Sequence, residues 1–178
     1  MKITIGVMGS SLADHPANID AATAIGKMIA EKKAVLITGA TTGLPFHAAK
    51  GAKQAGGEVI GFSPAINIEE HQKMGLPVEF HDLIICTGLT FKGRNLLNIR
   101  ASQAVLFIGG SMGTLNEFTI AYDEEKIMGI LDGSGGFCDH MQNWIKHLAK
   151  PGNRSVIHYS NKVSTLVNSV FQSIPFTK

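Results

Sequence analysis

Short apolar runs alternate with helix-patterned segments along the whole of this 178-residue chain. The run from Ala104 to Ile108 is apolar at every position, which is typical of a strand covered on both faces in a parallel sheet. Repeated strand-then-helix units with short turns predict such a sheet with helices on both faces. The sequence therefore predicts a Rossmann-like α/β fold in a single domain that spans residues 1–178.

The expected elements follow from apolar periodicity and from glycine and proline positions. Strands are expected over residues 3–8, 34–37, 58–62, 83–86, 104–108, 126–131 and 155–158. Helices are expected over residues 16–30, 45–55, 69–74, 91–102, 114–125, 139–148 and 163–174. Ligands of such folds bind at the carboxyl ends of the strands, so the loops that follow strands are the places to search for function.

Composition excludes several classes of protein. Apolar residues make up 44% and charged residues 17%, which excludes a disordered chain. A net charge of +2 without a basic stripe gives no reason to expect a nucleic-acid partner. No apolar stretch approaches the ~18 residues of a membrane span, and the first residues do not form a signal peptide. We therefore expect a cytoplasmic protein that binds no membrane.

The cysteines and histidines give no pattern of metal ligands. Cys86 and Cys138 make neither a disulfide framework nor a CxxC clip. Cys86 lies in an apolar run and is expected to be a small buried core residue. The seven histidines are scattered and form no HExxH motif, so no metal site is expected.

The strongest local signal is the segment from Gly109 to Glu117, between a buried strand and a helix. Its glycines allow several backbone N–H groups to converge, and a helix N-terminus adds positive potential. We therefore expect Gly110, Ser111, Gly113 and Thr114 to bind an anion, most naturally a phosphate. In the alternative interpretation, Thr114 and Glu117 form a capping box and only satisfy helix-end donors.

Two further glycine turns follow the first two strands. Gly9 and Ser10 follow the first, and Gly39 follows the second, so all three are expected to contact the ligand. Neither turn is a GxGxxG motif, and the chain has no GxxxxGK[ST] P-loop. A mononucleotide or a similar phosphorylated small molecule therefore fits better than NAD or ATP with magnesium, and no cofactor is expected.

Two arginines occupy the helix that follows the fourth strand. Arg94 stands near the helix N-terminus, where a cation is unfavourable to the helix dipole, so a ligand or a carboxylate partner would explain it. A solvated surface arginine is the plainer alternative. Arg100 lies about 120° farther around the helix, so the two arginines do not point the same way, and one of them is expected to pair within the protein or across a dimer.

These residues together resemble the LOG family of cytokinin-activating phosphoribohydrolases, which has also carried the label "possible lysine decarboxylase". The family signature reads Glu-Arg-Lys and then Pro-Gly-Gly-x-Gly-Thr-x-x-Glu. Arg94 precedes Gly109 by fifteen residues, as in the family, and Gly113, Thr114 and Glu117 match the end of the motif. The chain departs from the signature at four positions: Gly93, Asn95, Gly109 and Ser111. The Arg-Asn variant is also similar to molybdenum cofactor carrier proteins of the same superfamily, which bind without catalysis.

Two functions follow from the resemblance. The first is cleavage of the N-glycosidic bond of a nucleoside 5′-monophosphate, such as a cytokinin riboside monophosphate or AMP, with Arg94 and Glu117 as catalytic residues. The second is a carrier or sensor that binds a phosphorylated purine or pterin, such as the molybdenum cofactor, without turnover. The resemblance also implies a homodimer formed through the helices expected at 91–102 and 114–125, which would bring Arg100 near the partner's site as a ligand-binding residue.

Overall fold

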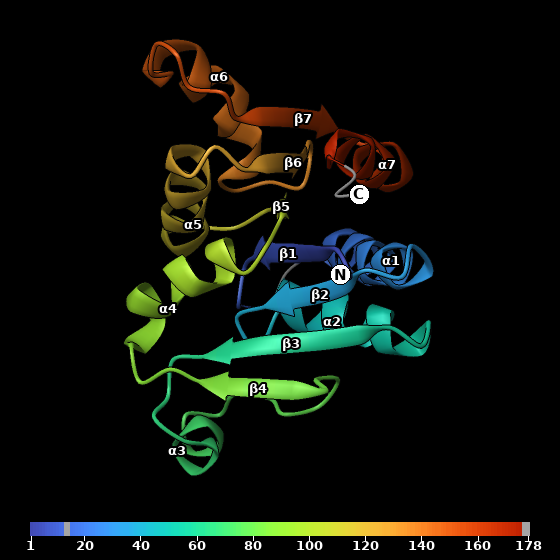
Figure 1. The fold of residues 1–178 in the computed structure, drawn as a ribbon, viewed down its shortest axis with the longest axis vertical. Helices are drawn as coiled ribbons and strands as arrows, with labels where there is room; N and C mark the ends of the chain where they lie inside the picture. Colours follow the sequence, from blue (N-terminus) through green and yellow to red (C-terminus); the bar gives the residue numbers. More distant parts are fainter. Residues whose placement is uncertain (13–14, 176–178) are drawn as a thin grey trace.

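A computed structural model describes residues 1–12 and 15–175 of the chain. One seven-stranded sheet forms in this part of the chain, with the strand order β4-β3-β2-β1-β5-β6-β7. Every neighbouring pair of these strands is parallel. Figure 1 shows the strands stacked in one twisted sheet, with β4 and β7 at its two edges. The predicted Rossmann-like α/β architecture is confirmed.

The elements alternate along the chain as predicted. The strands are β1 (Thr4–Gly9), β2 (Val35–Thr38), β3 (Glu58–Ser63), β4 (Leu83–Cys86), β5 (Ala104–Ile108), β6 (Ile127–Leu131) and β7 (Val156–Ser160). The helices are α1 (Pro16–Glu31), α2 (Leu44–Gln54), α3 (Ile68–Lys73), α4 (Thr90–Arg100), α5 (Met112–Asp123), α6 (Cys138–Leu148) and α7 (Val163–Ser173). Most bounds differ from the expected ones by one or two residues, as helix and strand ends usually do.

Two apolar clusters hold the helices to the sheet. One joins Ile5 and Leu106 of the sheet to Ile25 of α1 and Leu166 of α7, all fully buried. The other lies on the opposite face and joins Phe107 to Phe118 of α5, with ring centroids 5.7 Å apart. Figure 1 shows α4 and α5 on one side of the sheet and α1 and α7 on the other.

The edge strand β4 differs from its prediction. Cys86 is only half-buried, and Leu83 and Ile85 of the same strand are 52% and 38% exposed. The expectation that Cys86 is a core residue was wrong, because β4 has a neighbouring strand on one side only and helices leave part of its surface open. The buried cysteine is Cys138, at the start of α6, where burial raises the pKa of the thiol to about 12.

Strand order reverses between β1 and β5, which lie next to each other in the sheet. From β1 the chain builds outward through β2, β3 and β4, then returns through α4 to β5 on the other side of β1. The carboxyl ends of β1 and β5 therefore flank a topological switch point, with the end of β2 next to that of β1. Doubly wound folds bind their ligands at such a point.

Candidate functional site

A polar cavity of about 190 Å³ opens at this switch point. Its walls come from the end of β1, from the loops that follow β1, β2 and β5, and from the N-terminal turns of α2, α4 and α5. The lining residues are Met8, Gly9, Ser11, Gly39, Thr41, Pro45, Phe91, Lys92, Arg94, Asn95, Ser111, Gly113, Thr114 and Glu117. Two cations, Lys92 and Arg94, face one carboxylate, Glu117, so the ionisable side chains of the lining favour an anionic ligand.

The glycine turn after β5 places the N-terminus of α5 in the cavity wall. Gly109 and Gly110 both have positive φ angles, +53° and +91°, which glycine adopts without strain. α5 then starts at Met112, and its N-cap residue Ser111 makes no side-chain capping hydrogen bond. Helix geometry leaves the first backbone N–H groups without intrahelical acceptors, so Gly113 presents an uncapped donor beside the cavity.

The capping-box alternative does not describe this turn. Thr114 lies within the first turn of α5 rather than at its N-cap, because the helix begins two residues earlier than expected. Glu117 does not reach back to the helix end; its carboxylate binds Arg94 and Asn98 of α4. Neither residue therefore caps the end of α5, and both line the cavity.

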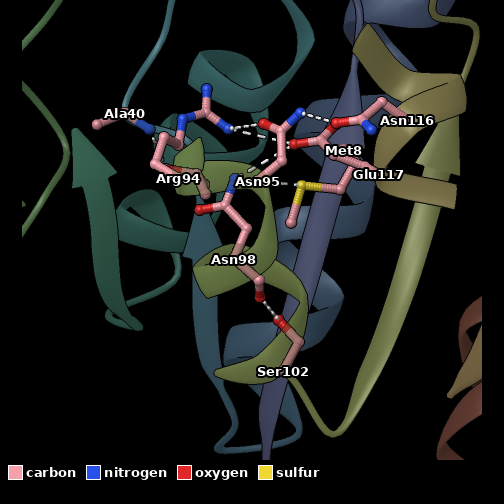
Figure 2. A network of polar contacts seen from close by, with 9 residues as sticks. Met8, Ala40, Arg94, Asn95, Asn98, Ser102, Asn116 and Glu117 are labelled. Carbon is pink, nitrogen blue, oxygen red and sulfur yellow. Dashed lines mark hydrogen bonds and ion pairs between the residues drawn. The ribbon is translucent and has the colours of Figure 1, made fainter. Parts of the chain in front are cut away.

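Arg94 and Glu117 form a buried ion pair across the base of the cavity. Arg94 Nη1 lies 3.2 Å from Glu117 Oε1, and the two side chains are only 7% and 9% exposed. Asn98 Nδ2 donates a second hydrogen bond to Oε1 at 3.2 Å, and Arg94 Nη1 also donates to Asn95 Oδ1 at 2.9 Å. Figure 2 shows these side chains converging from α4 and α5. Asn95 extends the network to Asn116, whose Oδ1 accepts from Asn95 Nδ2 at 2.8 Å.

Burial sets the electrostatics of this pair. It raises the pKa of Glu117, and the positive charge of Arg94 opposes this shift. Burial likewise lowers the pKa of Arg94 from its ordinary value, but a guanidinium starts so high that it stays charged at neutral pH. Both contacts from Arg94 and Asn98 go to Oε1, and no described residue donates a hydrogen bond to Glu117 Oε2.

Two buried polar atoms of the network lack partners among the described residues. Arg94 Nε and Asn98 Oδ1 have no hydrogen-bond partner there. Buried polar groups are nearly always paired in native proteins, so an unpaired donor on a cavity-lining arginine is a position for a ligand or a water. This feature, together with the uncapped helix turn, makes the cavity a candidate anion site.

Seven of the ten predicted site residues line the cavity. These are Gly9, Gly39, Arg94, Ser111, Gly113, Thr114 and Glu117. Gly110 shapes the turn behind the cavity, since a Cβ on it would lie 2.4 Å from Thr114 Oγ1. Ser10 is next to the lining but not in it, and its backbone oxygen accepts from Leu44 N at 2.8 Å.

Arg100 lies outside the cavity of its own chain. Its Nη2 lies 2.7 Å from Glu124 Oε1 at the end of α5, and the side chain is exposed. The structure thus gives it a partner within the protein, one of the two roles that its position in the helix predicted. Its place beside a partner's site in a dimer stays a prediction.

Sequence reasoning missed several lining residues. Phe91 and Lys92 occupy the first turn of α4 just before Arg94, and Asn95 follows it directly. The signal was present, because a helix that follows a strand presents its whole first turn to the carboxyl edge of the sheet. Within residues 1–12 and 15–175, no three His, Cys, Asp or Glu side chains gather as metal ligands would.

Fold and pocket together define a Rossmann-like α/β protein with a polar pocket at the switch point of its sheet. The chain belongs to the SLOG cluster4 family, whose sequence model matches residues 2–167. The sequence resemblance is therefore supported at the level of this wider family rather than for the LOG enzymes themselves. No helix in the described part of the chain is long and apolar enough to cross a bilayer.

Known proteins resemble the chain over most of its length. An uncharacterized protein of Archaeoglobus fulgidus is 36% identical over 122 residues, which are 68% of this chain and 75% of the relative. The molybdenum cofactor binding protein of Rippkaea orientalis is 27% identical, with a TM-score of 0.82 over 98% of this chain and 99% of the other. The molybdenum cofactor carrier protein of Chlamydomonas reinhardtii is 29% identical, with a TM-score of 0.79 over 97% and 98%.

Proposed function

We propose that this protein binds a phosphorylated small molecule in the cavity and carries a phosphorylated pterin of the molybdenum cofactor type without chemical turnover. The observation that carries the proposal is the convergence of the uncapped α5 turn with Lys92 and Arg94 in one polar cavity. A helix N-terminus with two cations beside it is well suited to a phosphate dianion. The likeness to two molybdenum cofactor proteins over nearly the whole chain supports the pterin.

Gly113 supplies the space for the phosphate. A Cβ on this residue would meet only Lys92 Nζ, at 3.9 Å, so the helix turn is open toward the cavity and its cation. The cavity of about 190 Å³ is smaller than the ~300 Å³ or more of pockets that enclose a whole drug-sized ligand. We infer that it holds the phosphate and the adjoining atoms, and that the ring lies at the mouth, where Phe91 is 45% exposed.

The fixed position of the Glu117 carboxylate is consistent with a carrier that performs no chemistry. Its carboxylate is nearly buried and is held by Arg94 and Asn98, so it is a fixed part of the wall. A residue locked in this way orients the arginine that faces the ligand, and carriage requires no bond to break. Molybdenum is cargo in this proposal, and no side chain of the chain is assigned to bind the metal.

A second candidate function is hydrolysis of a nucleoside 5′-monophosphate to free base and ribose 5-phosphate. Glu117 Oε2 accepts no hydrogen bond from the described residues, and Glu117 lines the cavity. In this reaction the carboxylate would stabilise the positive charge that develops at C1′ and orient a water, while Arg94 holds the carboxylate in place. Glycosidases use two carboxylates; one could suffice here, because a purine leaves more readily than a sugar alkoxide.

One experiment with two measurements separates the candidates. Purified protein is incubated with AMP and other nucleoside monophosphates, and free base is measured by chromatography. Binding of the same nucleotides, and of molybdenum cofactor released from a molybdoenzyme, is measured in parallel. Retention of the pterin without base release supports the carrier. Base release that is lost in Glu117→Gln supports the hydrolase, and failure to bind any phosphorylated compound contradicts both.

A further inference from the structure

One half-buried histidine, His81, lies behind the cavity wall without lining the cavity itself. His81 precedes β4 and extends over β3, where Gly61 leaves room for its ring: a Cβ at Gly61 would lie 2.8 Å from His81 Cδ2. The same Cβ would lie 2.8 Å from the Cβ of Ala40. The absence of a side chain at Gly61 therefore lets the imidazole approach the loop that follows β2, which lines the cavity through Gly39 and Thr41.

Hydrogen bonds connect His81 to this loop. His81 Nε2 lies 2.9 Å from Oγ1 of Thr38, the last residue of β2, and Ala40 N donates to the same Oγ1 at 3.1 Å. Thr38 and Ala40 are both completely buried. Ala40 has a φ of +49°, in the left-handed region that residues other than glycine rarely adopt. The Thr38 hydroxyl therefore stabilises an unfavourable backbone conformation.

The partners of His81 determine its protonation state. His81 Nδ1 lies 2.9 Å from the carbonyl oxygen of Glu79, and a carbonyl only accepts, so Nδ1 carries a hydrogen. In the neutral ring Nε2 is then an acceptor, and the Thr38 hydroxyl donates to it while accepting from Ala40 N. With a second proton, Nε2 would donate to Oγ1 instead, and the hydroxyl hydrogen would lose this acceptor, so the arrangement favours a neutral imidazole.

The surroundings of His81 favour the neutral form. Burial lowers the pKa of His81 below its ordinary value, and the nearby His71 acts in the same direction. The backbone oxygen of Glu79 and the carboxylates of Asp82 and Glu79 oppose the shift. His71 does not bond to the loop, since its ring nitrogens face Ser63 Oγ at 2.8 Å and the Pro77 oxygen at 3.0 Å.

The loop in turn determines the position of Arg94. A Cβ on Gly39 would lie 2.3 Å from Arg94 Nη2 and 2.5 Å from Nη1, so the guanidinium packs directly on the Gly39 backbone. A change at Ala40 therefore displaces the surface on which the arginine rests. Contacts run without a gap from His81 through Thr38 and the loop to the Arg94–Glu117 pair.

We propose that His81 is a positioning residue for the anion pocket, and that protonation of its imidazole at acidic pH releases the loop after β2 and weakens ligand binding. The inference rests on the proposed function, because it concerns the affinity of the same cavity. It adds a pH-dependent control to that cavity: ligand is held at neutral pH and released in acid.

The test uses calorimetric titration with sulfate, whose charge does not change between about pH 5 and about pH 8, the range in which histidine titrates. We expect the wild-type affinity to fall by up to about tenfold at the acidic end, as the loss of one neutral hydrogen bond implies. His81→Gln retains an acceptor for the Thr38 hydroxyl and cannot be protonated. It should bind within about threefold of wild type at neutral pH, with a flat pH profile.

Two further variants control the interpretation. Thr38→Val removes the hydroxyl and should weaken binding at every pH, while Thr38→Ser should restore it. His158→Gln is the matched control, because His158 Nε2 also bonds a hydroxyl, Ser173 Oγ at 2.9 Å, between β7 and the end of α7. It should leave the wild-type pH profile unchanged. If the sulfate affinity of His81→Gln still falls at acidic pH, the titration belongs to another group, such as Glu117, and the inference is overturned.

A ligand-free measurement separates this inference from the proposed function. NMR titration of the unliganded protein should show the Gly39 and Ala40 amide resonances shifting with the same midpoint as the His81 ring. If the amides do not follow the ring, the inference is wrong even where sulfate binds. If the amides follow the ring but no phosphorylated compound binds at any pH, the coupling stands and the proposed function is wrong.

Discussion

The guanidinium of Arg94 occupies the space that a side chain on Gly39 would fill. An ideal Cβ on Gly39 would come within 2.3 Å of Nη2, closer than any real contact allows. Gly39 follows β2, and Arg94 lies one turn into α4. The glycine backbone thus supports an arginine that binds Glu117, which follows a strand of the other half of the sheet. Glycine is therefore required at this position by the neighbouring cation.

Gly39→Ala should therefore damage both the fold and the pocket. The added methyl group must displace the buried guanidinium from its contact with Glu117, and overpacking of this kind costs roughly 1–3 kcal/mol. We expect the free energy of unfolding, measured in urea, to fall by that amount and the affinity for sulfate to fall with it. Gly113→Ala is the control for stability: its methyl group would meet only Lys92 Nζ, at 3.9 Å, so the free energy of unfolding should not fall. Unchanged stability in Gly39→Ala would contradict the contact.

Gly113→Asp should abolish anion binding without unfolding the protein. The carboxylate would stand beside Lys92 in the space assigned to the phosphate, where it repels an anionic ligand. An acidic residue in the first turn of a helix is itself favourable, by about 0.3–1 kcal/mol. We expect binding of nucleoside monophosphates and pterin to be lost, with an unfolding transition at or above that of the wild type.

Met112→Asp is the matched control for that substitution. It adds the same charge to the same turn of α5, but Met112 is 74% exposed and does not line the cavity. Binding should weaken only modestly, through long-range repulsion that added salt screens. Equal loss of binding in both variants would show that the negative charge acts at a distance and would contradict the placement of the phosphate beside Gly113.

The sequence predicted the sheet because its signals are local. The five apolar residues of β5 need no tertiary information to be recognised as a strand buried on both faces, and the structure buries all of them. The convergence of Arg94 and Glu117 was also accessible, since each follows a strand and the carboxyl ends of parallel strands share one edge. Their functional roles remain predictions.

Other features depend on side-chain directions that the sequence does not encode locally. The partnership of Asn98 with Glu117 depends on the phase of α4 where it crosses α5. The contact between His81 and Thr38 depends on a loop that extends over Gly61. Cys86 was misjudged for a similar reason, because an apolar run does not reveal that its strand ends up at the edge of the sheet.

Glu117→Gln separates a structural role from a catalytic one. Glutamine retains an oxygen that can accept from Arg94 and Asn98, but it cannot stabilise a developing positive charge as a carboxylate does. We expect the affinity for phosphorylated ligands to stay the same or to rise a few-fold, since one negative charge leaves the cavity wall. If the protein is a carrier, neither the wild type nor the variant releases base from AMP. Base release that is fast in the wild type and absent in the variant would overturn the carrier.

The same substitution reveals a pH dependence of stability. Burial raises the folded-state pKa of Glu117 above its ordinary value of 4.5. The folded state therefore holds this proton more tightly than the unfolded state. The resulting stabilisation is fully present below about pH 4.5 and is lost as the pH rises through the folded-state pKa. The free energy of unfolding of the wild type minus that of Glu117→Gln should thus decrease with rising pH in urea titrations. A difference that increases instead would show that Arg94 outweighs burial.

The last prediction concerns assembly: we expect a homodimer formed on the side of the sheet that carries α4 and α5. Leu83 and Ile85 of β4 are exposed on this side, and Leu89, which precedes α4, is 49% exposed. Apolar groups gathered in this way usually mark an interface. Light scattering at micromolar concentration should give a mass twice the 19.0 kDa of one chain.

Leu83→Glu should reduce the measured mass to that of one chain, because a charge on an apolar contact is costly to bury. Val156→Glu is the control, since Val156 is 41% exposed on the opposite edge strand β7, and it should leave the dimer intact. A wild-type mass of one copy contradicts the dimer, and dissociation by Val156→Glu alone moves the interface to the other edge of the sheet.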